Sequence, residues 1–386
     1  MLSAWPWRFL VLIALLIGLP LLGVWLAGER PGAYLEFPPT PRPQPPGDFS
    51  WRWFAAIALL IIATVSPFVV RVLTAEAPSP RPMSRRAQFP WWGWLGLGIL
   101  AVAWVLAWNR FSWFAPLQPY TFTPLWLGYI LVINALTWQR TGRCMLVNHT
   151  GYFLILFPLS AGFWWFFEYL NGFVANWYYV GGHNGEAVTV FLSASLPFAT
   201  VLPAVLGTKD WLASFPRLSA GLQDCWRIPA PLASLLPWIA LLSGIGGLTG
   251  IGIWPDYLFP LVWVAPLLLL VAFQDLAGQD NLLSSMIRGD WRPLWLGALA
   301  GLLCGFFWEL WNYQSLVHWK YTVRQVHTLQ LFEMPLLGYA GYLPFGLTCV
   351  AIVDFFFPKE RQPGREPDSA QLRQPEVGYV AQKTKR

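Results

Sequence analysis

Charge is scarce in this chain. Of its 386 residues, 11% are Asp, Glu, Lys or Arg and 56% are hydrophobic, whereas soluble domains carry about a quarter charged residues. This balance excludes an ordinary water-soluble globular protein. We attribute the net charge of +6 to basic loop and tail residues that set the orientation of the chain in a membrane. We therefore expect no nucleic-acid partner.

Residues that bind metals or form disulfides are also few. The chain has four cysteines and four histidines, with no CxxC, HxxH or ExxH pattern. This argues against a structural disulfide framework and a zinc site, so we expect no metal. No P-loop, glycine-rich nucleotide turn or Ser-His-Asp order is present either, and we expect no cofactor.

Long apolar runs dominate instead. Runs near 20 residues match the hydrocarbon thickness of a bilayer, and they predict an all-α polytopic membrane protein with about ten transmembrane helices. The runs are 5–27, 51–72, 90–108, 123–139, 151–170, 188–206, 232–253, 257–274, 293–312 and 336–357. Many of the 26 tryptophans lie at the ends of these runs, where an indole is half apolar and half wet.

The basic residues predict an orientation. Most of the 25 Lys and Arg fall in the loops after every second run and in the C-terminal tail. By the positive-inside rule, both termini then face the cytoplasm of a bacterial-type inner membrane. The tail, 359–386, is polar and poor in apolar residues, which predicts disorder.

Short motifs recur in one order and indicate an internal duplication. Leu196-Pro197-Phe198-Ala199 and Leu343-Pro344-Phe345-Gly346 lie 147 positions apart, and Glu168 corresponds to Glu309. We expect a two-helix N-terminal extension with a proline-rich outer loop at 1–88, a first four-helix repeat at 89–231 and a second at 232–358. Because each repeat has an even number of spans, the copies should be parallel in the membrane.

Each repeat brings polar and aromatic residues to its outer end. An ionisable residue within a membrane helix is a candidate functional residue, and an ExxN spacing puts both side chains on one helix face. The candidate acids are Glu168, Glu186, Glu309 and Glu333, and the candidate binding residues are Asn171, Asn312, Trp177, Tyr179, Trp319, Tyr321 and His318. Each Asn is expected to donate its amide hydrogen to the neighbouring carboxyl.

Two interpretations of these carboxyls remain open. A carboxyl surrounded by indole and phenyl rings is costly to ionise and can act as a general acid, while aromatic faces can stabilise a carbocation. Protonation-driven chemistry on an apolar alkene needs both. The alternative is structural, with each Glu–Asn pair tying one helix to its neighbour through hydrogen bonds.

The outer motifs resemble those of the integral-membrane carotenoid cyclases of the lycopene-cyclase type. The second copy has Glu309, then Trp319-Lys320-Tyr321, then Glu333-Met334-Pro335, in the order of that family. The first copy keeps Glu168 and Trp177-Tyr178-Tyr179, but Ala187-Val188 follows Glu186. The family's paired glutamates after the proline are replaced here by Leu336-Leu337-Gly338. The resemblance implies a similar fold more than the same cyclase reaction.

These observations lead to three expectations for function. The first is binding or modification of an apolar isoprenoid or carotenoid-like lipid, by a cyclase- or isomerase-like enzyme with a carboxylic general acid. The second is a proton- or cation-coupled transporter, and the third is a non-catalytic membrane scaffold. A membrane lipid or isoprenoid is the expected partner, and a protein partner or homo-oligomer is left open.

Overall fold

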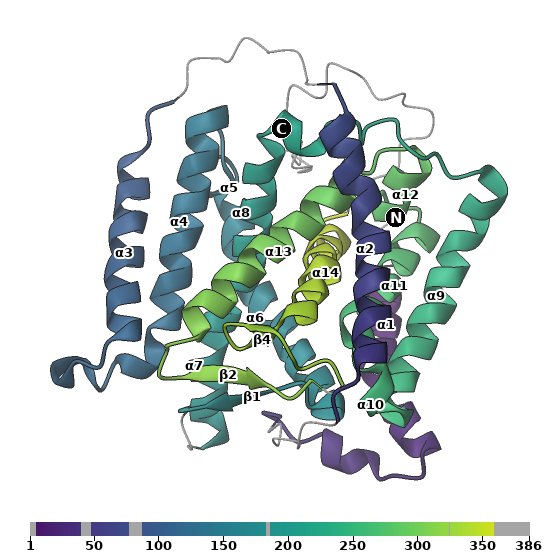
Figure 1. Ribbon diagram of the computed structural model, residues 1–386, viewed down its shortest axis with the longest axis horizontal. Coiled ribbons are helices and arrows are strands. Elements are labelled where there is room, and N and C mark those ends of the chain that lie inside the picture. The colour runs from purple at the N-terminus through teal and green to yellow at the C-terminus, as the bar shows by residue number, and fades with distance from the viewer. Residues whose placement is uncertain (1–4, 40–47, 77–86, 183–185, 324, 359–386) are drawn as a thin grey trace, which may run out of the picture.

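The computed structural model describes residues 5–39, 48–76, 87–182, 186–323 and 325–358, and most of them are helical (Figure 1). Within these residues, nine helical segments are long and apolar enough to cross a membrane, and a tenth, α11, is apolar but shorter. The prediction of an all-α polytopic membrane protein is confirmed. The proline-rich stretch 40–47 and the tail 359–386 lie outside the described residues.

The main helices are α1 (Trp5–Leu26), α2 (Trp51–Thr74), α3 (Trp91–Trp108), α4 (Phe122–Thr141), α5 (Met145–Asn148), α6 (Thr150–Val174), α7 (Ala187–Phe198), α8 (Val201–Ala213), α9 (Ala230–Ile253), α10 (Pro255–Leu258), α11 (Leu261–Leu276), α12 (Leu282–Ile287), α13 (Arg292–Asn312) and α14 (Tyr342–Phe356). Short 3-10 turns include η2 (Pro31–Tyr34), η5 (Pro216–Ser219) and η6 (Leu336–Gly341). The strands are β1 (Trp177–Val180), β2 (His318–Tyr321), β3 (Gln330–Leu331) and β4 (Met334–Pro335).

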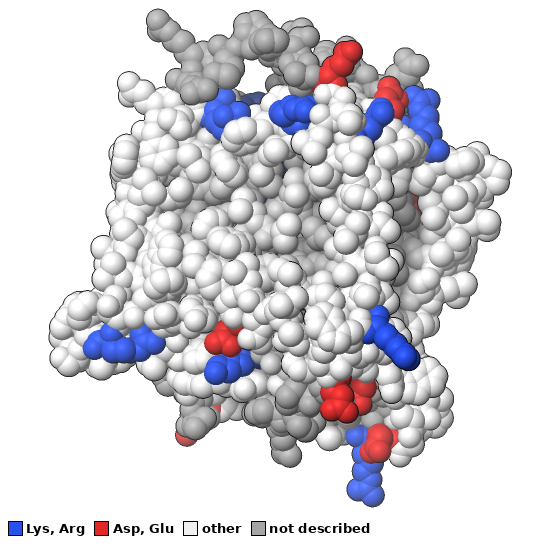
Figure 2. Space-filling view, viewed as in Figure 1, with Lys and Arg blue, Asp and Glu red and all other residues white. Residues whose placement is uncertain are grey.

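Charged side chains lie at two opposite edges of the bundle. Figure 2 shows Lys, Arg, Asp and Glu gathered along the upper and lower edges of one face, with a broad belt between them that is almost free of charge. Such a belt is what a bilayer core requires of a multi-pass protein. The kind of membrane and the side that each terminus faces stay predictions.

The helices after α2 pack in two sets with matching neighbours. In the first set α3 packs on α4 and α4 on α8; in the second, α9 packs on α11 and α11 on α14. These neighbours are the ones that two copies of one unit would have. The duplication and the domain boundaries drawn from it stay predictions.

Glycines allow the closest helix contact in the second set. A Cβ at Gly301 of α13 would lie 2.3 Å from the carbonyl oxygen of Tyr342, and one at Gly346 of α14 would lie 2.3 Å from that of Gly297. Any larger residue would push these helices apart. Close backbone approach through small residues is a common way for helices to associate in lipid.

Helix α2 is attached mainly at its ends. None of its residues is buried. At its C-terminal end, the Arg71 side chain donates to the Gly221 carbonyl at 3.0 Å, and Arg217 donates to the Ala75 carbonyl at 3.0 Å. At its other end, the Ser50 amide donates to the Gln325 carbonyl at 2.9 Å. In Figure 1 the helix runs across the front of the bundle, between α14 and α9.

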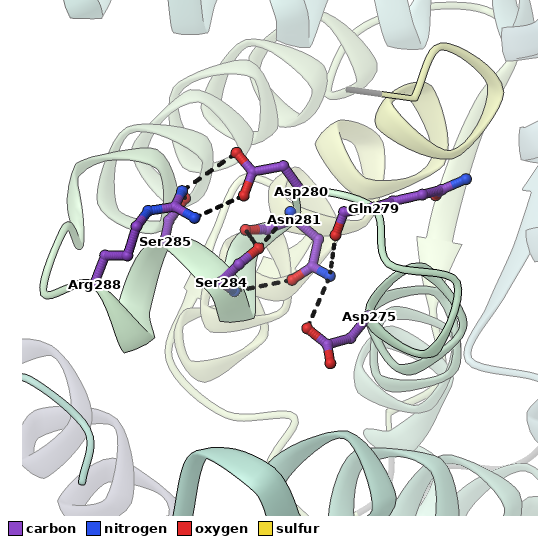
Figure 3. A network of polar contacts seen from close by, with 7 residues as sticks. All are labelled: Asp275, Gln279, Asp280, Asn281, Ser284, Ser285 and Arg288. Carbon is purple, nitrogen blue, oxygen red and sulfur yellow. Dashed lines mark hydrogen bonds and ion pairs between the residues drawn. The ribbon is translucent and has the colours of Figure 1, made fainter. Parts of the chain in front are cut away.

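The connection from α11 to α13 is fixed by a polar network (Figure 3). Asn281 and Ser284 form a capping box at the start of α12, because each side chain bonds the other residue's backbone amide. The Arg288 guanidinium forms an ion pair with Asp280 at 2.9 Å. These bonds satisfy the free amides at a helix start and fix the connection that leads into α13.

The span formed by α7 and α8 is broken in its middle. At the break the Ser160 hydroxyl of α6 donates to the Phe198 carbonyl at 2.6 Å and accepts from the Leu202 amide at 3.0 Å. An interrupted membrane helix needs such partners for its freed backbone groups.

Two short strands join the two halves of the chain at one end of the bundle. β1 pairs with β2 antiparallel, with Trp177 opposite Tyr321, Tyr179 opposite Trp319 and Tyr178 opposite Lys320. In Figure 1 both strands lie at the lower edge, beneath α6, α13 and α14. The two W-x-Y motifs are therefore side by side.

Candidate functional site

Asn171 and Asn312 anchor the strands that follow their helices. The Asn171 amide donates to the Trp177 carbonyl at 2.8 Å, and its oxygen accepts from the Asn176 amide at 2.8 Å. Asn312 donates to the Trp319 carbonyl at 2.8 Å and accepts from the Trp319 amide at 2.7 Å. The expectation that each Asn donates to the nearby carboxyl is wrong. Backbone groups just after a buried helix end also need hydrogen-bond partners, and the side-chain amides of the two Asn residues bind these groups instead.

Aromatic side chains bind the first carboxyl. Glu168 is 3% exposed, and its Oε1 accepts from Trp164 Nε1 at 2.8 Å, Trp177 Nε1 at 3.1 Å and Tyr179 Oη at 2.6 Å. Trp164 comes from the preceding turn of α6, whereas Trp177 and Tyr179 come from β1. Burial and the Glu168 carboxyl both raise the pKa of the Tyr179 phenol, so Tyr179 stays a donor at neutral pH.

The second carboxyl is held by phenols. Glu309 is fully buried; its Oε1 accepts from Tyr321 Oη at 2.6 Å and from Tyr342 Oη at 2.5 Å. Trp319 donates its indole hydrogen to Tyr321 Oη at 2.7 Å rather than to the carboxyl. Glu309 Oε2 is buried and has no hydrogen-bond partner among the described residues.

The two carboxyl sites differ by an exchange of large and small residues. Trp164 lies four positions before Glu168, and Gly305 lies four positions before Glu309. A Cβ at Gly305 would lie 2.2 Å from the Tyr342 ring, so the glycine makes room for Tyr342. The residue 147 positions before Tyr342 is Ser195, whose hydroxyl accepts from Trp165 Nε1 at 2.9 Å. In the first site a tryptophan supplies the extra donor; in the second a tyrosine does.

A cavity of about 890 Å³ lies beside these carboxyls. Its wall contains Glu168 and the strand residues Trp177, Tyr179, Trp319 and Tyr321. The wall also contains residues from the broken α7–α8 span, from α2, α4, α11, α13 and α14, from η6 and from the segment before the proline-rich loop. Their lining residues include Glu36, Phe37, Ser193, Ala194, Pro197, Phe198, Trp263, Leu337, Gly341 and Tyr342.

The remaining candidates are not part of the cavity lining. Glu309 lies behind Tyr321 and Tyr342, which do line the cavity, and neither Asn171 nor Asn312 lines it. Glu186, Glu333 and His318 are also outside its lining. The His318 ring instead contacts the Leu316 carbonyl, with Nδ1 3.3 Å from the oxygen.

Several wall residues were not predicted from the sequence. Trp164 could have been found, because i and i+4 side chains meet on a helix. Trp263 stacks on Trp177 with ring centroids 5.6 Å apart, and Glu36 comes from a segment more than a hundred positions away. No local pattern marks either of them.

The cavity wall has acidic groups and aromatic rings without basic ones. Among the described residues, its lining includes Glu36 and Glu168 and contains no Lys, Arg or His. In the same part of the chain, no group of three or more His, Cys, Asp or Glu is placed to hold a metal ion. The chemistry available at this wall is therefore hydrogen bonding, proton transfer and contact with aromatic rings.

Comparison with known proteins assigns no family. No protein-family model matches the chain, and no curated protein or solved structure matches it.

Proposed function

We propose that the protein binds an apolar isoprenoid or carotenoid-like lipid in this cavity and modifies it, with Glu168 as the proton donor. The observation that carries the proposal is the Glu168 carboxyl in the wall of an aromatic cavity at the end of a membrane bundle. A carboxyl enclosed by rings, without a basic partner among the residues that the structure describes, is the arrangement in which a carboxylic acid acts as a general acid.

The size and lining of the cavity support an apolar ligand. Ligand cavities usually have volumes of about 300–1,000 Å³ and mostly apolar walls, and this one has about 890 Å³. Most of the lining side chains are aromatic or aliphatic. A hydrocarbon chain that moves from the bilayer into this cavity would keep apolar surroundings. The few polar groups of the wall would fix its position.

The hydrogen bonds at Glu168 fix the position of its carboxyl. Trp164, Trp177 and Tyr179 all donate to Oε1, which fixes the plane of the carboxyl and leaves Oε2 for a ligand. A proton on Oε2 would add to one alkene carbon, with the π electrons forming the new C–H bond. The carbocation would then lose a proton from a neighbouring carbon to the Glu168 carboxylate, which moves the double bond and regenerates the acid. The positive charge that forms would lie among aromatic rings, whose faces attract cations.

The test measures bound lipid and product separately. The full-length protein and two variants, Ala194→Trp and Glu168→Gln, are produced in cells that make acyclic isoprenoids. Mass spectrometry then measures the lipid extracted from the purified protein and the isoprenoids of the cells. Ala194→Trp fills the cavity and should abolish co-purified lipid. Glu168→Gln keeps the shape and should retain the lipid, while product falls about 10²–10⁴-fold, the usual contribution of a general acid.

Glu29→Gln is the matched control, because Glu29 is exposed at the end of α1 and lies outside the cavity. It should retain both bound lipid and product. The proposal fails if the wild-type protein carries no isoprenoid and leaves the cellular isoprenoids unchanged. Uptake of a solute that depends on a pH gradient and on Glu168, without any lipid change, would favour a transporter instead. A co-purified protein without either phenotype would favour a scaffold.

A further inference from the structure

The cavity has an acidic, aromatic wall, and this composition sets the charge of what it can hold. We infer that it selects ligands with a positively charged group, an amine or quaternary ammonium at the end of an apolar chain, and that this group lies against Glu168. The inference rests on the proposed lipid-binding function and names the ligand class of the same cavity.

Within the described lining, the charged groups are of one sign. Glu36 is exposed and Glu168 is buried, and both line the cavity. His318 and Lys320, the basic residues of β2, are both outside the lining, and Lys320 is paired with Tyr178 in the strand register. Carboxylates attract cations and repel anions, and salt screens a buried one such as Glu168 less than an exposed one such as Glu36.

The surroundings of Glu168 match a cation more closely than a neutral group. Its three hydrogen bonds all go to Oε1 and stabilise the ionised carboxyl. The ionised form would pair with an ammonium through Oε2, whereas the neutral form would donate a proton to an alkene. Trp164, Trp177 and Tyr179 donate to the same carboxyl from the edges of their rings, through Nε1, Nε1 and Oη, so three aromatic side chains lie beside it. A carboxylate beside several aromatic rings is the combination that recognises quaternary ammonium groups.

The described part of the same wall disfavours phosphorylated lipids. A phosphate in this cavity would face two carboxyls, and the described lining offers it no Lys, Arg or His. A prenyl diphosphate therefore does not fit, and the reaction that supplies a prenyl ligand must remove the diphosphate first. Phosphate sites normally use basic side chains or a metal ion.

The test uses three probes that share a farnesyl tail. Farnesol, farnesyl trimethylammonium and farnesyl phosphate are titrated against the full-length protein in nanodiscs of zwitterionic lipid, and binding is measured by thermophoresis. Empty nanodiscs give the partitioning of each probe into lipid. The ammonium should bind at least about tenfold more tightly than the alcohol, a difference within the range of cation–π and charge contacts. The phosphate should bind most weakly.

Two variants assign the effect to the carboxyl. Glu168→Gln should remove the advantage of the ammonium and leave the alcohol within about threefold of its wild-type affinity, because Gln keeps the shape of the wall. Glu29→Gln, at an exposed position, should leave all three affinities unchanged. A second reading, the thermal unfolding midpoint without ligand, checks that each variant is folded.

The outcomes separate the two proposals. If farnesol binds but the ammonium has no advantage, or keeps its advantage in Glu168→Gln, the charge inference is overturned and the lipid-binding function stands. Phosphate binding as tight as ammonium binding also overturns the inference. If no probe binds beyond its partitioning into empty nanodiscs, both proposals fall.

Discussion

At the scale of single residues, the two carboxyls show how equivalent positions acquire different surroundings. Glu168 receives two indole donors and one phenol, while Glu309 receives two phenols. Gly305 and Tyr342 occur where the first half has Trp164 and Ser195. The result is one carboxyl in the cavity wall and one behind it.

The first prediction concerns this exchange. Gly305→Ala should lower the unfolding midpoint in detergent, because its Cβ would lie 2.2 Å from the Tyr342 ring and overpacking costs about 1–3 kcal/mol. Tyr342→Ser alone should also destabilise, through loss of a bond to Glu309. The double variant should lose less stability than the sum of the two, because the smaller serine side chain no longer meets the new methyl group.

Gly172→Ala is the control for this pair, since nothing lies within 4 Å of a Cβ at Gly172 in α6. It should be neutral or slightly stabilising, as Gly→Ala is in an open helix position. If the stability losses of Gly305→Ala and Tyr342→Ser add exactly in the double variant, the two positions are not coupled and the proposed exchange of large and small residues is wrong.

At the scale of elements, each strand is placed by the helix that precedes it. Asn171 and Asn312 bond the backbone of β1 and β2, and the strands then pair with each other. This places the W-x-Y side chains in the cavity wall. The spacing of Glu and Asn was visible in the sequence, but the partner of each Asn was not. The amides bind the strands because buried backbone groups beyond a helix end must be satisfied.

The second prediction follows from these anchors. Asn312→Ala should destabilise the protein by about 1–3 kcal/mol, because the buried backbone groups of Trp319 lose their partner. It should also weaken farnesol binding, since β2 carries Trp319 and Tyr321 into the wall. Thermal unfolding and probe titration on the same preparation measure both.

Asn109→Ala provides the comparison, because the Asn109 amide bonds the Val105 carbonyl of the helix it follows, at an exposed position. Its effect should stay within about 0.5 kcal/mol, as for most surface substitutions. Equal effects of the two Asn→Ala changes would show that Asn312 does not anchor β2.

At the scale of the whole molecule, the two charged edges and the apolar belt define a direction across the membrane. The native cysteines should react little with a thiol label, so single cysteines introduced into the loops can report this direction. Burial raises the pKa of the Cys144 thiol to about 11 and raises that of Cys225, and the thiolate is the reactive form. Cys304 and Cys349 are buried within the bundle.

The third prediction is the orientation itself. Asn109→Cys and Arg143→Cys place exposed thiols in the segments that precede and follow α4. With both termini in the cytoplasm, a maleimide that does not cross the inner membrane should label Asn109→Cys in intact cells. It should label Arg143→Cys only after lysis. The unsubstituted protein measures background, and the reverse pattern would invert the orientation.

The sequence by itself determined the membrane class, the helical content and the two acidic positions. Each of these is a local property: a run of apolar residues must match the bilayer, and a carboxyl within such a run is conspicuous wherever the helix packs. The spacing of Glu, Asn and the W-x-Y motif also follows from neighbours along the chain.

Only the tertiary structure decided which groups bind each carboxyl and what forms the cavity. Tyr342 reaches Glu309 from another helix, Trp263 stacks on Trp177, and Glu36 joins the same wall as Glu168. These contacts join residues far apart in the sequence, and each depends on the packing of whole helices. That packing is set by side-chain volumes at the interfaces, such as the missing side chain of Gly305, and no periodic pattern of apolar residues records it.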